Sequence, residues 1–420
     1  MQTLIISKPN FNIAKGIATV SAEIELPDRN FELYFRGSSD HIGECGADPF
    51  LAVCLTSAMK LKLPIEVRGD VSPRLLRTLN TIQEIFQCWY PENLSRVAIT
   101  ACPRLTEKEA ALGCASFFSG GVDSFYTAYK QINQVSALVF VHGFDISLGN
   151  RSLRAIVSKK IKETSSALNK SLVEVETNSR QLTDNYVSWA EHQFGPALAS
   201  VAFILNPIVS KVFIPSSESY AHLDPCGSHP LLDPLWSTEY IKIIHDGSEC
   251  TRNQKVSEIT RHHQTLHFLR TCWENPDNKY NCGSCEKCIR TMINLETAGS
   301  LQQCTAFDVP LIPERVASMR IPLDLVYFHV LENLRILKTQ GKNLALITAL
   351  ETAVNRYRTE KIAKELQSTP RFPSSPEIGL AVSKHIKSFM QSLNKIPGVS
   401  FPQKCLAYIF QFLSIIWRRL

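Results

Sequence analysis

The sequence predicts an α/β protein with a doubly wound parallel sheet, a four-cysteine zinc element, an N-terminal α+β region and a C-terminal helical region. Two observations carry this prediction. An apolar run, 114–118, is followed by a glycine turn and a helix-compatible run, 125–130, which gives the order strand, turn, helix. Four cysteines gather in the segment 272–288. Further apolar runs indicate more buried strands: 136–146, 172–176 and 211–217.

The glycine turn is Ser119-Gly120-Gly121-Val122-Asp123-Ser124. Adjacent glycines carry no Cβ, so backbone N–H groups can close on an anion, and the following helix adds partial positive charge. The hydroxyls of Ser119 and Ser124 can donate to phosphate oxygens, and Asp123 can hold Mg²⁺. The turn therefore predicts a phosphate-binding loop, with an unliganded βα turn as the alternative. It matches neither G-x-x-x-x-G-K-[ST] nor G-x-G-x-x-G.

The cysteines Cys272, Cys282, Cys285 and Cys288 have the spacing C-x9-C-x2-C-x2-C. Four thiolates at these separations can close a tetrahedral all-sulfur site, so we predict structural zinc. Gly283 eases the turn between two of them. An iron–sulfur cluster and unliganded thiols are the alternatives. A ferredoxin-type run would continue with Cys-Pro, but this chain has Met-Ile at 292–293. Nearby cations would lower the thiolate pKa values: Lys279, Lys287 and Arg290.

The hexapeptide SGGVDS resembles the signature of the PP-loop ATP pyrophosphatases, which include GMP synthetase, NAD synthetase and asparagine synthetase. Together with the four cysteines it resembles the 7-cyano-7-deazaguanine synthases of that superfamily. The resemblance covers about residues 112–300 and implies the nucleotide-binding fold of the superfamily. It includes a second strand ending at Gly143, a loop and helix marked by Gly195 and Pro196, and a T-x-x-x-K segment from Thr251 to Lys255.

The resemblance implies an ATP-dependent ligase that adenylates a carboxylate, of a 7-carboxy-7-deazaguanine-like base, and releases pyrophosphate. A nitrogen nucleophile, either ammonia or a protein amine, then displaces AMP. Asp123, Lys255 and Arg252 are the expected catalytic residues, because positioned cations offset charge that develops on the α-phosphate. The expected cofactors are ATP, Mg²⁺ and Zn²⁺. The expected nucleotide-binding residues are Ser119, Gly120, Gly121, Val122, Asp123, Ser124, His142, Gly143 and Gly195.

Two other functions stay open. One is a PP-loop sulfurtransferase that thiolates tRNA, which needs a catalytic cysteine pair near the nucleotide and a basic RNA-binding face. The other is an ATP-binding scaffold that recruits a partner without turnover. The intact phosphate loop argues against the scaffold, and neither requirement of the sulfurtransferase is evident in the sequence.

We divide the chain into an N-terminal α+β accessory domain (1–111), the PP-loop domain with its zinc site (112–305) and a C-terminal helical region (306–420). The flanks exceed those of a plain 7-cyano-7-deazaguanine synthase. They resemble the extended forms found in anti-phage defence operons, as does Val122, where the enzyme usually carries glutamine. The tract 225–237 has no close match in the family.

Several polar residues have two interpretations. His142 and Asp145 lie at the carboxyl end of the second strand, where open α/β sheets bind ligands, so a nucleotide site and a structural role are both open. A Pro/Gly-rich tract reads either as an acceptor-substrate loop or as a surface loop: His222, Asp224, Ser228, His229 and Asp233. Three histidines have metal-ligand spacing but lack an H-E-x-x-H carboxylate, which favours an ordinary helix face: His262, His263 and His267.

The N-terminal region predicts a hairpin over 17–26 and 31–35, helices over 47–61 and 74–89, and a linker over 100–113. The C-terminal region predicts helices over 323–338 and 343–358, followed by a proline-rich break over 368–377. The apolar run 405–417 is too short to span a bilayer. A buried helix, a homodimer contact or membrane-surface binding are its three interpretations.

Composition agrees with an intracellular, multidomain enzyme of 420 residues, 44% of them hydrophobic. The N-terminus lacks a signal peptide, so a cytoplasmic location with reduced or metal-bound thiols is expected for the 13 cysteines. No transmembrane segment is expected. The net charge of +6 is dispersed, which gives no strong nucleic-acid signal. The expected partners are ATP, the deazapurine acid and a protein acceptor or operon partner.

Overall fold

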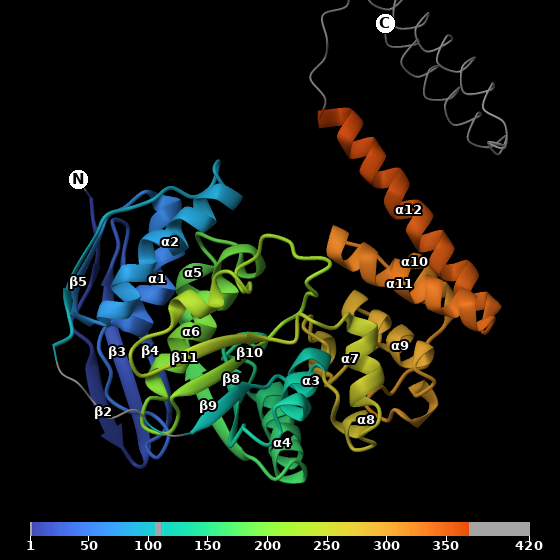
Figure 1. The fold of residues 1–420 in the computed structure, drawn as a ribbon, viewed down its shortest axis with the longest axis horizontal. Coiled ribbons are helices and arrows are strands. Elements are labelled where there is room, and N and C mark those ends of the chain that lie inside the picture. Colours follow the sequence, from blue (N-terminus) through green and yellow to red (C-terminus); the bar gives the residue numbers. More distant parts are fainter. Residues whose placement is uncertain (1, 106–110, 112, 369–420) are drawn as a thin grey trace, which may run out of the picture. The chain divides into compact units, whose positions relative to one another are not determined.

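The computed structural model describes residues 2–105, 111 and 113–368 (Figure 1). They form an α/β fold built on one large, mostly parallel sheet of eleven strands. The strand order is β11-β10-β7-β8-β9-β4-β3-β1-β5-β6, and β2 pairs with β3 outside this path. The predicted α/β class and its mostly parallel sheet are thereby confirmed.

Five neighbouring strands form a parallel block at one end of the sheet. They are β7 (Cys114–Phe117), β8 (Ala137–His142), β9 (Ser171–Thr177), β10 (Lys211–Pro215) and β11 (Lys242–Asp246). The first four coincide with the apolar runs in the sequence. Strand β11 was not predicted, because its five residues, KIIHD, hold only two apolar side chains. The chain runs from β7 to β8 on one side and returns to β10 on the other side of β7.

The N-terminal strands continue the same sheet. They are β1 (Leu4–Ile6), β2 (Asn10–Ala14), β3 (Ile17–Glu25), β4 (Asn30–Ser38), β5 (Ile65–Val71) and β6 (Ile99–Pro103). The predicted hairpin is confirmed as β3 and β4, whereas β6 lies partly in the predicted linker. Strand β4 pairs antiparallel with β9, with Phe35 opposite Thr177 and Gly37 opposite Val175. The sheet therefore continues across the boundary predicted at residue 111.

Helices cover both faces of the sheet, because alternate side chains of the buried strands enter two different cores. Phe117, Val139 and Ile214 belong to a core with α1, α2 and α6. Leu138 and Phe213 belong to a second core with α3, α4 and α7. The bounds of these helices are α1 (Asp48–Leu61), α2 (Pro73–Trp89), α3 (Val122–Lys130), α4 (Arg151–Ala167), α6 (Phe194–Ile204) and α7 (Arg252–Ile259).

A third core joins the helices that follow the cysteines. The remaining helices are α5 (Ser179–Thr183), α8 (Thr265–Phe268), α9 (Glu286–Thr297), α10 (Pro313–Ser318), α11 (Asp324–Gln340) and α12 (Leu344–Ser368). Helices α11 and α12 correspond to the two helices predicted there. The described residues up to Tyr357 form one compact unit, and those from Arg358 to Ser368 belong to another.

Some predictions fall outside the described residues. These are the terminal run 405–417, with its three interpretations, and all but the first residue of the proline-rich break 368–377. Within the described part of the chain, no helix has both the length and the hydropathy needed to cross a membrane.

We expect a chain trimmed to residues 112–305 to aggregate. Removing β4 would leave β9 with an unpaired edge, and removing α1 would expose the apolar face of α6, which packs against it. The trimmed chain would also lose the buried hydrogen bond of 2.5 Å from Thr56 to Gln193. Size-exclusion chromatography and urea unfolding provide the measurement. A monodisperse trimmed chain with a cooperative transition would contradict this expectation.

Candidate functional site

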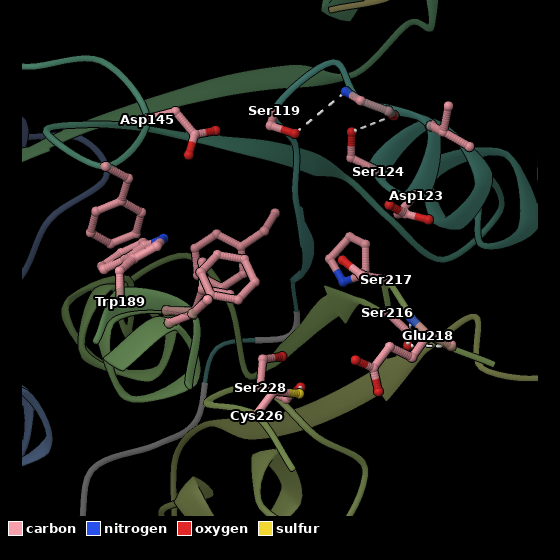
Figure 2. Close-up of a pocket in the computed structure, with 18 of the residues that line it drawn as sticks. Ser119, Asp123, Ser124, Asp145, Trp189, Ser216, Ser217, Glu218, Cys226 and Ser228 are labelled. Atoms are coloured by element: carbon pink, nitrogen blue, oxygen red, sulfur yellow. Dashed lines mark hydrogen bonds between the residues drawn. The ribbon is translucent and has the colours of Figure 1, made fainter. Parts of the chain in front are cut away.

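A cavity of about 690 Å³ opens at the carboxyl ends of β7, β8 and β10. Its position follows from the topology. Beside β7 the chain connections diverge, so the two loops that leave β7 and β10 separate and leave a crevice between them. Figure 2 shows Ser119, Asp123 and Ser124 on one side of this cavity, with Cys226 and Ser228 across from them.

The predicted phosphate loop connects β7 to α3 at the rim of the cavity. Gly120 has φ +78°, a conformation that side-chain-bearing residues rarely adopt, and a Cβ there would lie 3.2 Å from Ile161 Cδ1. Gly121 N–H donates to Ser119 Oγ over 3.4 Å, and Ser124 Oγ donates to the Gly121 carbonyl over 2.9 Å. The loop therefore presents the first turn of α3 and the Ser119 hydroxyl to the cavity.

Asp123 lies in a buried cluster with Lys255 and Arg252, both from α7. Lys255 Nζ is 3.3 Å from Asp123 Oδ1, and Arg252 Nη1 is 3.6 Å from Oδ2. Burial opposes ionisation of Asp123, but Lys255, Arg252 and Lys287 hold the pKa of its carboxyl below the usual value. Lys255 is 1% exposed and also donates to the Ser216 carbonyl over 2.6 Å. The three predicted catalytic residues thus lie together.

The side chain of Arg252 is held in place by hydrogen bonds to residues of α9. Its Nε donates to Asn294 Oδ1 over 3.2 Å and its Nη2 to Thr291 Oγ1 over 2.9 Å. Burial, followed by the charge of Arg290, lowers the pKa of Arg252 to about 10. Helix α7 begins with a capping box in which Thr251 and Gln254 satisfy each other's backbone N–H groups. The orientation of both cations is therefore set by the start of one helix.

Four predicted nucleotide-binding residues do not line this cavity: Gly120, within the loop itself, and His142, Gly143 and Gly195. His142 is 3.0 Å from Glu174 through Nε2, and its Nδ1 accepts from Arg154 over 3.3 Å. A Cβ on Gly143 would lie 2.0 Å from the Thr177 carbonyl, and one on Gly195 would lie 2.1 Å from the Gly227 carbonyl. Close backbone packing is therefore enough to explain why both positions are glycine. Asp145, by contrast, does line the cavity.

The loop after β10 forms the far wall of the cavity. Asp224 and Ser228 line it, whereas His222 stacks on Phe328 with ring centroids 4.7 Å apart. Asp233 is fully buried and 2.7 Å from His245 Nδ1. His229 is also buried. The predicted substrate loop is therefore divided between cavity-lining and packing residues.

An aromatic wall was missed by the sequence analysis. Trp89 and Tyr90 from the end of α2 line the cavity together with Trp189 and Phe194. Tyr90 Oη donates to the Pro225 carbonyl over 2.6 Å, which ties the N-terminal region to the loop after β10. Aromatic residues at the end of an amphipathic helix look like ordinary core residues, so no local signal distinguished them.

Glu218 was also missed, although it follows the end of β10, where ligand-binding residues are expected. Burial raises the pKa of its carboxyl to about 7, despite the backbone N–H of Asp224 that donates to it over 2.9 Å. A carboxyl with this pKa exchanges protons readily near neutral pH. Cys226 lies in the same wall, and burial raises the pKa of its thiol above the ordinary value.

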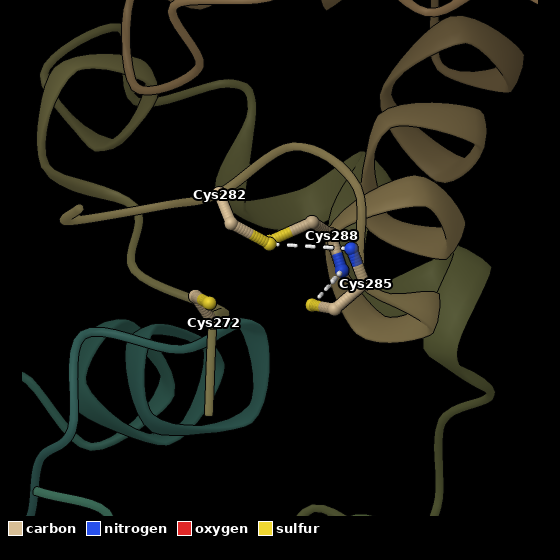
Figure 3. A group of neighbouring side chains, drawn as sticks. All are labelled: Cys272, Cys282, Cys285 and Cys288. Carbon is tan, nitrogen blue, oxygen red and sulfur yellow. Dashed lines mark hydrogen bonds between the residues drawn. The ribbon is translucent and has the colours of Figure 1, made fainter. Parts of the chain in front are cut away.

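The four predicted cysteines gather in one buried group whose sulfurs all lie within 4.8 Å of one another (Figure 3). Cys282 and Cys288 sulfurs are 3.8 Å apart. Tetrahedral zinc with Zn–S bonds of ~2.3 Å would separate its sulfurs by ~3.8 Å. Gly283 has φ +67°, which confirms the predicted turn. This group could therefore bind a metal such as zinc.

Among the described residues, the cysteines are the one group of at least three candidate ligands placed to hold a metal ion. The histidines near residue 265 do not join such a group. His262 stacks on Tyr129 at 3.8 Å between ring centroids, and His267 lies 2.6 Å from Thr305 Oγ1.

We expect about one zinc per chain in the purified protein and a colourless solution. Cys285→Ser should lower the zinc content and destabilise the chain, because metal binding at such a site is coupled to folding. The exposed Cys88 provides the control as Cys88→Ser. Elemental analysis and thermal unfolding check both variants. Brown protein containing iron would contradict the zinc assignment.

Glu218 predicts a pH dependence of stability. Its folded pKa, about 7, exceeds the ordinary glutamate pKa of 4.5, so its stabilising contribution is full below pH 4.5 and is lost as pH rises through about 7. Glu218→Gln stays neutral and keeps the acceptor for Asp224. It should unfold at a Tm ~2 °C above wild type at pH 8, with no difference at pH 4. Glu92→Gln, at an exposed position, is the control. Equal pH profiles for wild type and Glu218→Gln would contradict the raised pKa.

Comparison of the chain with protein-family models, with curated proteins and with solved structures found no match. The sequence motifs and the geometry of the cavity are therefore the features that indicate a function. The cavity combines a glycine-rich loop, a carboxylate held between two cations and an aromatic wall.

Proposed function

We propose that this chain is an ATP-dependent ligase of the PP-loop type that adenylates a carboxylate. The observation that carries the proposal is the convergence of the loop 119–124 with Asp123, Arg252 and Lys255 at the opening beside β7. Backbone N–H groups, a helix N-terminus and buried cations together favour a polyphosphate.

In the proposed first step, a carboxylate oxygen of the substrate attacks the α-phosphorus of ATP. An O–P bond forms, the bond to the β-phosphate oxygen breaks, and pyrophosphate leaves. The loop 119–124 would hold the β- and γ-phosphates, Asp123 would offer its oxygens to Mg²⁺, and Arg252 would offset charge on the α-phosphate. Lys255 would act by keeping Asp123 ionised and oriented.

In the second step, a nitrogen nucleophile attacks the acyl carbon and AMP leaves with the shared oxygen. The aromatic wall of Trp89, Tyr90, Trp189 and Phe194 suits a planar heteroaromatic acid, which supports a 7-carboxy-7-deazaguanine-like substrate. Glu218 is placed in the cavity wall with a pKa of about 7, so it can accept the proton that the attacking nitrogen loses.

The four-cysteine site would have a structural role, because all four positions of a tetrahedral metal are taken by sulfur. A protein acceptor and a place in anti-phage defence rest on the resemblance of the extended chain alone.

The sulfurtransferase alternative draws on one feature of the cavity, the thiol of Cys226. Its pKa is raised by burial, and its Sγ lies 3.0 Å from the Ser228 carbonyl as a donor. A protonated thiol is a weak nucleophile. This feature favours ligation over thiolation, because the ligase needs no cysteine nucleophile.

Asp123→Asn should abolish pyrophosphate release, a loss of at least ~100-fold, because it removes the ionised carboxylate proposed to hold Mg²⁺. Asparagine is preferred to alanine because the Lys255 side chain is 1% exposed. Alanine would leave the buried ammonium group without any oxygen from the side chain at position 123, whereas asparagine keeps one. ATP–pyrophosphate exchange with 7-carboxy-7-deazaguanine provides the assay. Asp184→Asn, on the surface near Arg180, is the matched control. Undiminished exchange in Asp123→Asn would contradict the proposal.

The same assay separates the two nucleophiles. Exchange measures adenylation alone, whereas product mass in the presence of ammonium or of a candidate partner protein measures capture. Full conversion with ammonium and no protein conjugate would assign a nitrile- or amide-forming enzyme and reject protein conjugation. Exchange without capture by ammonium would support a protein amine as acceptor.

A further inference from the structure

Arg270 is a buried cation beside the phosphate loop that the proposed mechanism does not use. The residue is 3% exposed, and its side chain lines the cavity. Among the described residues it forms no salt bridge, and its Nε has no hydrogen-bond partner. Burying a charge is costly unless an opposite charge compensates it. Such a cation in a cavity wall suits an anionic ligand.

The position of Arg270 is set by the backbone of the phosphate loop. Its N–H donates to the Gly120 carbonyl over 2.7 Å, and its Cβ lies 3.4 Å from where a Cβ on Gly120 would stand. A Cβ at Gly120 would therefore be in van der Waals contact with Arg270. The two segments lie side by side.

The side chain of Arg270 reaches toward the turn that follows β8. Its Nη2 donates to Asn275 Oδ1 over 2.9 Å, and Asn275 Nδ2 donates in turn to the Asp145 carbonyl over 2.7 Å. Asp145 lines the same cavity. Arg270 thus connects the phosphate loop with the β8 turn, the two loops between which a nucleotide would lie.

The four-cysteine element holds Arg270 in place. Asn281 Oδ1 accepts from Thr271 N–H over 2.8 Å and from Cys272 N–H over 3.2 Å, and its Nδ2 donates to the Leu269 carbonyl over 2.8 Å. The residues on both sides of Arg270 are therefore fixed next to the cysteine group. Lys287, from the first turn of α9, is a second cavity-lining cation of this element.

We propose that Arg270 is an anion-binding residue of the nucleotide site, supplied by the four-cysteine element, whose guanidinium binds a phosphate group between the phosphate loop and the β8 turn. The inference rests on the proposed function, since it takes ATP as the ligand. It assigns the cysteine element a direct part in nucleotide binding in addition to stabilising the fold.

The test measures binding of ATP with Mg²⁺ and of adenosine to the full chain by calorimetry. Arg270→Ala should weaken ATP binding about 10- to 100-fold, the loss expected when a charge-assisted hydrogen bond is removed, and leave adenosine binding unchanged. Arg270→Lys keeps the charge but loses the planar guanidinium, so its affinity for ATP should lie between those of wild type and Arg270→Ala. Arg261→Ala, whose side chain is 73% exposed in the turn after α7, is the matched control and should bind as wild type.

Zinc content measured on the same samples distinguishes the rival role, in which Arg270 only balances the charge of the thiolates. Zinc loss in both Arg270 variants, or equal weakening of ATP and adenosine, would overturn the inference. ATP binding by Arg270→Ala as tight as in wild type would also overturn it while leaving the ligase proposal intact. Failure of wild type itself to bind ATP would instead reject the proposed function, and this inference with it.

Discussion

The buried charge of Lys255 constrains the whole site. An ammonium group that is 1% exposed requires a nearby anion or carbonyl, and Asp123 and Ser216 provide them from two different loops. Asp123 belongs to α3, Lys255 to α7, and Ser216 to the end of β10. Satisfying this one ammonium group therefore brings together three elements that are distant in the sequence, and the opening beside β7 follows from their positions.

The sequence was most informative where the chemistry is local. Loop 119–124 and the cysteine spacing each lie within a short segment and need particular backbone conformations, as the positive φ values of Gly120 and Gly283 show. The buried strands β7 to β10 were found because they are short apolar runs. Strand β11 was not predicted because three of its five residues are charged or polar, and only its pairing with β10 makes it a strand.

The rest of the site could not be predicted from local patterns, because it depends on contacts between distant segments. Tyr90 enters the cavity through a hydrogen bond to Pro225, 135 residues later in the chain. Arg270 lies beside the phosphate loop because its N–H donates to the Gly120 carbonyl, a contact between distant segments that no local pattern indicates. His142 illustrates the opposite case. Its position at the carboxyl end of a strand suggested a ligand, but its ring contacts Glu174 and Arg154 and does not line the cavity.

The pairing of β4 with β9 has a consequence for synthesis of the chain. Arg36 on β4 forms an ion pair with Glu176 on β9, 140 residues later. A ribosome adds 5 to 20 residues per second, so β4 would wait roughly 10 s for its partner strand to emerge. During that interval β4 presents an open edge, and charged side chains such as Arg36 and Glu32 discourage pairing with other nascent chains. Arg36 would thus have two successive roles: it first discourages pairing at the open edge of β4, and it later forms the ion pair with Glu176 across β4 and β9.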